Sequence, residues 1–90
     1  MRYYLGQTEY KWTHAETDIE KIWIRRELGN ELCSTVDANG WRWVLLRTHS
    51  VALPGDIFCR TIVYADSHDD KLDTHFVLKF PHVVATPLAK

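Results

Sequence analysis

The chain has 90 residues, of which 46% are hydrophobic and 26% are charged, and its formal net charge is −1. This composition predicts one folded domain over residues 1–90 and excludes whole-chain disorder and a strongly basic phosphate-binding surface. No stretch approaches the roughly 18 apolar residues of a membrane span, and the N-terminus lacks the apolar core of a secretory signal. We therefore expect a cytoplasmic protein in which Cys33 and Cys59 are reduced thiols.

The first third of the chain predicts two short strands and one helix. Residues 2–5 and 9–12 suit strands, and Gly6-Gln7 between them can turn the chain. Two overlapping capping boxes and a terminal Gly29 predict a helix over 14–28. Its core-facing stripe is expected to contain Ala15, Ile19, Ile22, Trp23 and Arg26, widened by Ile24 and Leu28.

Residues 41–48 are the segment around which the predicted sheet is built. Apolar side chains alternate onto both of its faces, which indicates a central strand covered on two sides. We expect residues 31–37 to pair with it antiparallel, because the intervening Asn39-Gly40 favours a tight hairpin turn.

The second half of the chain predicts two further strands. A Leu-Pro-Gly-Asp turn signal over 53–56 precedes residues 57–65, which are rich in β-branched and aromatic side chains. A polar loop over 66–71 leads to an alternating strand over 74–80, and 82–90 are expected to be a frayed tail. The sequence thus predicts an α+β fold, with one helix packed on an antiparallel sheet of four or five strands.

The densest group of ionisable side chains lies between residues 68 and 75. Asp70, Asp73 and His75 are weak candidates for metal ligands, since carboxylates and imidazoles bind divalent ions. Their spacing matches no metal motif, so a solvated loop is the favoured interpretation and no cofactor is expected. A small hydrolase or nuclease that uses this loop, or His49 with His75, is the alternative function.

No motif identifies a catalytic residue. Cys33 and Cys59 are expected on strands, and no nucleophile signature surrounds either. The four glycines form no phosphate loop, and the chain contains neither a nucleophile elbow nor a zinc-ligand cysteine pair. These residues point to no known family.

The aromatic side chains are the least ordinary feature, with four tryptophans and four tyrosines. We expect the core to contain Trp23, Trp43, Phe76 and Phe80. The remaining aromatics suit an interface, because Trp, Tyr and Arg are enriched at the energetic centres of protein interfaces. The expected binding residues are Trp41, Arg42, Arg47 and Tyr64.

The predicted function is a non-catalytic protein-binding module that acts as an inhibitor or adaptor. Its small size and lack of motifs suit a phage or mobile-element protein that blocks a host defence protein. Binding of single-stranded nucleic acid on an aromatic sheet is a less favoured alternative. A homodimer through an exposed edge strand also remains open.

Overall fold

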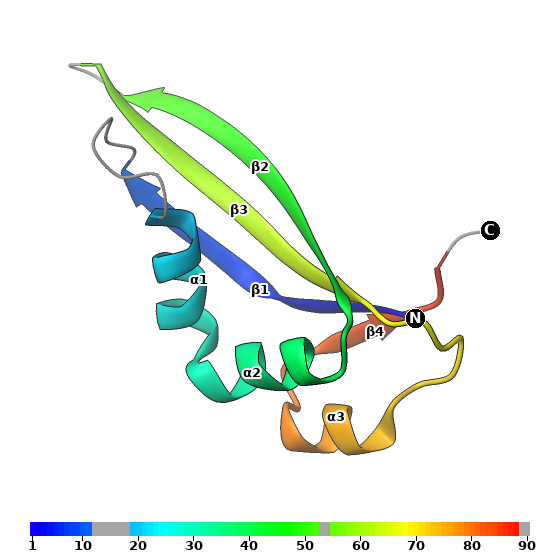
Figure 1. Ribbon diagram of the computed structural model, residues 1–90. Helices are drawn as coiled ribbons and strands as arrows, with labels where there is room; N and C mark the ends of the chain where they lie inside the picture. Colours follow the sequence, from blue (N-terminus) through cyan, green and yellow to red (C-terminus); the bar gives the residue numbers. More distant parts are fainter. Residues whose placement is uncertain (12–18, 53–54, 89–90) are drawn as a thin grey trace.

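The computed structural model of the chain describes residues 1–11, 19–52 and 55–88. Over these residues, four strands form one antiparallel sheet in the order β2-β3-β1-β4, with helices on one side (Figure 1). The elements in chain order are β1 (Arg2–Lys11), α1 (Ile19–Leu28), α2 (Asn30–Ala38), β2 (Arg42–Ala52), β3 (Asp56–Asp66), α3 (Thr74–Lys79) and β4 (Val84–Thr86). The predicted α+β class is confirmed, although the described residues form three helices where the sequence predicts one.

β1 is a single strand of ten residues, so the predicted turn at Gly6-Gln7 is wrong. The strand pairs with β3 along its length, and the register shifts once between Tyr4 and Gly6, as at a β-bulge. Gly6 has φ +148°, and a Cβ at this position would lie 2.6 Å from Cδ2 of Leu28. Gly6 therefore permits a bulge and the close approach of α1 instead of a reversal of the chain.

α1 confirms the helix prediction over residues 19–28, while residues 14–18 lie outside the described residues. Ile24 is buried and Leu28 packs against the core, whereas Ile22 is 53% exposed. Trp23 is half-buried, and the guanidinium carbon of Arg26 lies 4.9 Å from its ring centroid. The prediction that Ile22 faces the core is therefore wrong. Ile24 and Leu28, which the sequence places at the edge of the predicted stripe, are the residues that face it.

Residues 31–37 belong to helix α2, so the predicted strand over this segment is wrong. Leu32, Cys33 and Val36 are buried, a spacing that fits one face of a helix. This burial stabilises a segment whose serine, threonine and valine have modest helix propensity.

Asn39 and Gly40 end α2 instead of forming a hairpin turn. Gly40 has φ +67°, and its N–H donates to the carbonyl of Asp37 at 3.0 Å. The N–H of Trp41 donates to the carbonyl of Val36 at 3.3 Å. Together these bonds form a Schellman motif, which like the tight hairpin turn requires a positive φ.

β2 is an edge strand and not the predicted centre of the sheet. Within the described residues it pairs with β3 alone, from Arg42 opposite Asp66 to Ala52 opposite Asp56, without a register shift. The predicted strand over 57–65 is confirmed as part of β3, which with β1 forms the centre of the sheet.

The C-terminal segment is a helix followed by a short strand. Residues 74–79 form α3, so the predicted strand is wrong. The Oδ1 atom of Asp73 caps the helix by accepting from the N–H of Phe76 at 3.0 Å, and Phe76 and Phe80 are buried one helical turn apart. The tail prediction is also wrong over Val84–Thr86, which pair with β1 as β4.

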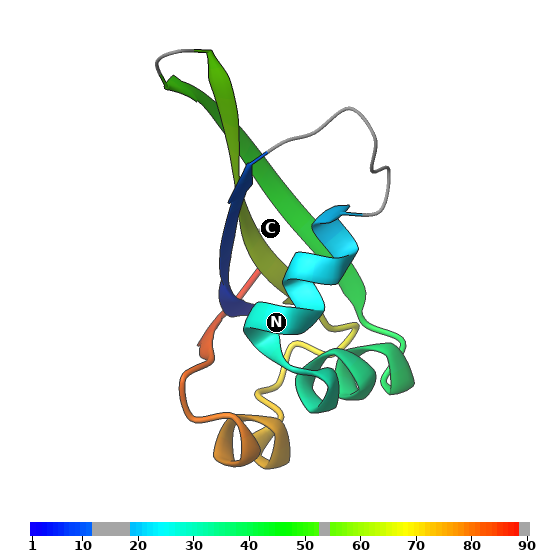
Figure 2. The same ribbon diagram turned by 90° about the vertical axis from the view of Figure 1, so that its left-hand side faces the viewer.

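The core lies between one face of the sheet and the helices. Figure 2 shows α1 and α2 on the same side of the strands, with α3 beneath them. The largest fully buried side chains include Tyr3, Leu5, Leu32, Val36 and Val63. In the part of the chain that the structure describes, no helix covers the opposite face of the sheet (Figures 1 and 2). No described helix is long and apolar enough to cross a membrane.

Candidate functional site: the open face of the sheet

Alternate side chains of the strands point away from the helices and form an open face. Tyr4 of β1 lies opposite Tyr64 of β3, and Tyr64 lies opposite Val44 of β2. Ile62 lies opposite Leu46 in the same way, and Val84 of β4 lies opposite Tyr4. We call this set the open-face patch: Tyr4, Val44, Leu46, Ile62, Tyr64 and Val84.

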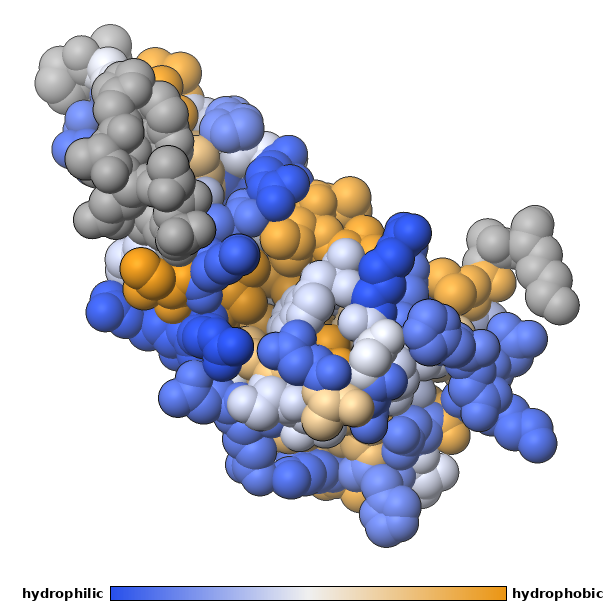
Figure 3. Space-filling model, viewed as in Figure 1, coloured by the Kyte–Doolittle hydropathy of each residue, from blue (hydrophilic) through white to orange (hydrophobic). Residues whose placement is uncertain are grey.

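The open-face patch is accessible although it is apolar. Leu46 is 49% exposed and Val84 is 57% exposed, and the other four residues are half-buried against one another. Tyr4 and Tyr64 meet edge to face with their ring centroids 5.6 Å apart, which fixes both rings in place. Figure 3 views the molecule from the β2 edge and shows an apolar area along the middle of this strand, bordered by charged side chains. Such a patch is typical of an interaction surface.

Charged side chains frame the patch at its β4 end. Arg2 donates to both carboxylate oxygens of Asp66, at 2.7 and 2.9 Å, and lies 5.4 Å from the ring centroid of Tyr64. The guanidinium of Arg2 lowers the pKa of Asp66 below its ordinary value. Arg42 lies opposite Asp66 on the adjacent strand and is exposed. Two arginines thus lie beside one carboxylate, which leaves this end of the patch positive.

The other end of the open face is balanced in charge. Arg60 lies 3.5 Å from Glu9, and Lys11 lies 3.0 Å from Asp56, in cross-strand ion pairs. Both pairs are exposed, so each contributes little to stability. The face therefore has an apolar centre, a neutral end and a positive end.

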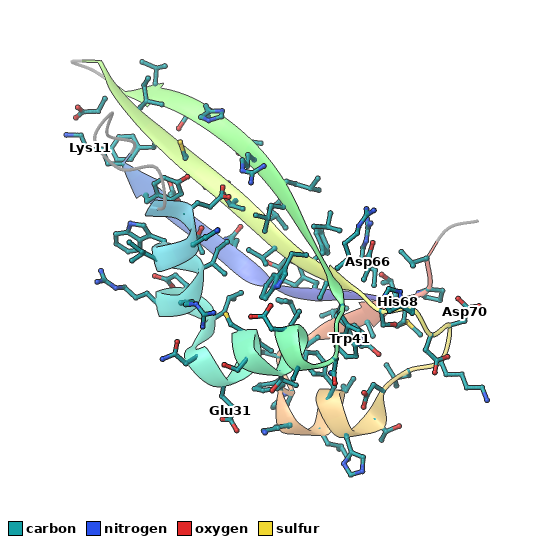
Figure 4. All side chains as sticks on the ribbon, in the orientation of Figure 1. Lys11, Glu31, Trp41, Asp66, His68 and Asp70 are labelled. Carbon is teal, nitrogen blue, oxygen red and sulfur yellow. The ribbon has the colours of Figure 1, made fainter. Side chains whose placement is uncertain are left out.

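The structure separates the four predicted binding residues into two pairs. Arg42 and Tyr64 lie on the open face, whereas Trp41 and Arg47 lie on the helix side. Trp41 stacks on Tyr3 with ring centroids 4.8 Å apart, and so belongs to the edge of the core (Figure 4). Besides Tyr64, sequence reasoning grouped Tyr4 only with the aromatics that suit an interface. It missed Val44, Leu46, Ile62 and Val84, because the strand register that gathers them is not visible in the sequence.

Arg47 joins β2 to α1. Its Nε and Nη2 atoms donate to the two carboxylate oxygens of Glu20 at 2.6 and 2.7 Å, and the hydroxyl of Thr61 donates to the same carboxylate at 3.0 Å. The hydrogen bond from Arg47 lowers the pKa of Glu20, and the same contact raises the pKa of Arg47. This arrangement holds the helix on the sheet.

The weak metal candidates remain apart in the structure. Asp70 lies in the exposed loop after β3 (Figure 4), Asp73 is occupied as the cap of α3, and His75 is exposed on that helix. Across residues 1–11, 19–52 and 55–88, no group of three or more His, Cys, Asp or Glu could hold a metal ion. His49 lies opposite Cys59 in the half of β2 that ends at Ala52, while α3 lies at the other end of the sheet (Figure 1).

The two cysteines are buried free thiols. Cys59 lies on β3 as expected, but Cys33 lies on α2, so its predicted strand position is wrong. Burial raises the pKa of the Cys33 thiol, which opposes formation of the nucleophilic thiolate.

Comparison with protein-family models, curated proteins and solved structures found no match to this chain.

Proposed function

We propose that the protein is a non-catalytic binding module that docks on another protein through the open face of its sheet. The observation that supports this function is the open-face patch: six apolar side chains from four strands on a face that no described helix covers. Two fixed tyrosines and neighbouring arginines provide the residue types found at the energetic centres of interfaces.

The charges around the patch favour a particular kind of partner. Arg2 contacts the carboxylate of Asp66 and Arg42 lies opposite this residue on the adjacent strand, so the positive end attracts a carboxylate from the partner. The expected partner surface is therefore an apolar area with an acidic side chain placed near Arg42. Binding of this kind suits an inhibitor or an adaptor, including a phage or mobile-element protein that blocks a host defence protein. The buried free thiols fit a reducing cytoplasmic setting.

A matched pair of leucine substitutions tests the proposal. Leu46→Asp places a charge in the open-face patch, whereas Leu78→Asp changes a leucine of α3 that is 75% exposed and does not belong to the patch. Wild type and both variants serve as bait in nuclease-treated lysates of the source organism at low and moderate salt, and melting temperatures verify folding. Leu46→Asp should lose a protein that wild type and Leu78→Asp both retain. Equal retention by all three baits would refute the open face as the docking surface.

Single-stranded nucleic acid is a second candidate ligand, favoured by one observation. Tyr4 and Tyr64 lie on the two central strands of the open face, where bases could stack on them. Against it, Arg2 and Arg60 already contact carboxylates, and the net charge is −1. Binding to labelled oligonucleotides that falls steeply with salt and is lost in Tyr64→Ala would favour this candidate over a protein partner.

A further inference from the structure

We propose that the free edge of β2 binds an extended segment of the partner as an added strand, and that this segment has a short apolar run flanked by carboxylates. This inference rests on the proposed function, because it specifies how a protein partner engages the edge strand beside the open-face patch. Three features of β2 support it: its edge, the surfaces on both sides of it, and the order of its charges.

The first feature is a long regular edge. β2 has eleven residues, pairs with β3 without a bulge, and contains no proline. Edge strands present unpaired N–H and C=O groups, and natural proteins often protect them with bulges, prolines or a covering element. α1 lies over β1, where Leu28 contacts Gly6, and not along the outer side of β2 (Figure 1). The described part of the chain therefore leaves the β2 edge open to main-chain hydrogen bonding.

The second feature is that β2 offers space for side chains on both sides. A groove of about 370 Å³ lies on the helix side, with Ile24, Cys33, Trp43 and Leu45 among its lining residues. Val44 and Leu46 lie on the open side, within the open-face patch. Since successive side chains of a strand alternate, a strand added to this edge would place one set in the groove and the other set beside the patch.

The third feature is the order of residues along β2. Arg42 and Arg47 flank an uninterrupted apolar run, and the strand contains no carboxylate. Opposite charges on directly paired strands are favourable and like charges are unfavourable. The complementary segment is therefore apolar in the middle and acidic at its ends, above all opposite Arg42, because Arg47 already contacts Glu20.

A second copy of this chain is a poorer occupant of the edge. Pairing β2 with another β2 would place side by side two strands that each contain Arg42 and Arg47. Neither copy would supply a carboxylate from this strand, so no ion pair would form across the two copies of β2. The acidic segment of a different protein is the occupant that matches the edge.

Selection from a display library of random linear peptides tests the proposal and does not require the partner to be identified first. The selected peptides should share a short apolar run flanked by Asp or Glu. A synthetic consensus peptide should bind Arg42→Glu about tenfold more weakly than wild type, and reselection on this variant should replace the acid at one flank by Lys or Arg. Lys71→Glu, which makes the same change in net charge in the loop after β3, should leave the affinity unchanged.

Amide hydrogen exchange then locates the bound peptide. Strand addition should slow the exchange of alternate amides of β2, the ones that face away from β3. A consensus without flanking acids, equal effects of Arg42→Glu and Lys71→Glu, or unchanged exchange in β2 would overturn the inference. Failure to enrich any peptide, or a dimer of the free protein in which the exchange of the β2 amides is already slowed, would also overturn it. A third outcome separates the two proposals. If the peptides bind without slowing exchange in β2, and Ile62→Asp abolishes their binding, then docking on the open face is supported and strand addition is refuted.

Discussion

Glu20 is the side chain through which α1 is held on the sheet, and its removal should measurably destabilise the protein. Its carboxylate accepts two hydrogen bonds from Arg47 and one from Thr61, so it links α1 to both β2 and β3. The Glu20 side chain is 17% exposed, while that of Arg47 is 52% exposed. Solvent therefore partly screens the ion pair with Arg47, whereas the hydrogen bond from the buried Thr61 is shielded from solvent.

The expected cost of Glu20→Ala follows from these two environments. The half-exposed ion pair contributes about 0.2–1 kcal/mol, the range of surface salt bridges. Loss of the acceptor leaves the hydroxyl of the buried Thr61 unpaired, which costs about 1–3 kcal/mol. We expect the free energy of unfolding to fall by about 2 kcal/mol in Glu20→Ala, and by less in Glu20→Gln, which keeps one acceptor oxygen.

The same contact predicts the sign of a pH effect. Arg47 lowers the pKa of Glu20 in the folded state, so the ionised carboxylate stabilises the fold at pH values above the pKa of the unfolded chain. This contribution is lost as the pH falls through the lower pKa of the folded state. The stability difference between wild type and Glu20→Gln should therefore be full near neutral pH and shrink below about pH 4.

Urea and thermal unfolding of wild type, Glu20→Ala and Glu20→Gln provide the measurement. Glu27→Ala is the matched control, because Glu27 is an exposed glutamate on the same helix. The reasoning is refuted if Glu20→Ala and Glu27→Ala have equal stability. A wild-type advantage over Glu20→Gln that stays constant into acid would likewise refute the pH argument.

Three further predictions concern stability and can be measured by the same unfolding assays. Within residues 1–11, 19–52 and 55–88, the buried hydroxyl of Thr8 has no hydrogen-bond partner, so Thr8→Val should be neutral or stabilising. Thr61→Val should cost about 1 kcal/mol because it removes a donor to Glu20, and the opposite order would contradict this. Trp43→Ala should cost about 2–3 kcal/mol, less than a fully buried tryptophan, because Trp43 is half-buried against the core; an unchanged melting temperature would contradict this packing. Gly6→Ala should cost more than the roughly 1 kcal/mol of Gly40→Ala, because both have positive φ but only Gly6 is in close contact with a helix, and equal costs would contradict this.

The errors in the sequence prediction come from residue patterns that are compatible with either of two kinds of secondary structure. A glycine with positive φ serves a hairpin turn as well as the end of a helix, so Gly40 could not reveal that α2 precedes it. Phe76 and Phe80 satisfy both strand alternation and helical spacing. Leu78 separates the two structures, because a strand would bury it with these two phenylalanines, whereas it is 75% exposed on α3.

The candidate site could be predicted only in part because its members meet across strands. Arg42 and Tyr64 were expected at the binding surface from residue type alone, and both lie on the open face. Tyr4 joins them through a register that depends on the bulge at Gly6, which local sequence does not specify. Trp41 and Arg47 are also of residue types that are enriched at interfaces. Trp41 stacks on Tyr3 and Arg47 contacts Glu20, however, and these tertiary contacts hold both on the helix side.

β2 has the sequence of a central strand but lies at the edge of the sheet, and this difference is the strongest link between its sequence and the proposed function. Apolar side chains on both faces are typical of a strand with neighbours on each side and cover on both surfaces. The described structure gives β2 one neighbouring strand, an open groove beside Trp43 and Leu45, and an uncovered face at Val44 and Leu46. Conflicts between local pattern and global position tend to occur at functional sites. A partner strand at this edge would supply the neighbour and the cover that the sequence of β2 predicts, and for that reason we place the docking segment there.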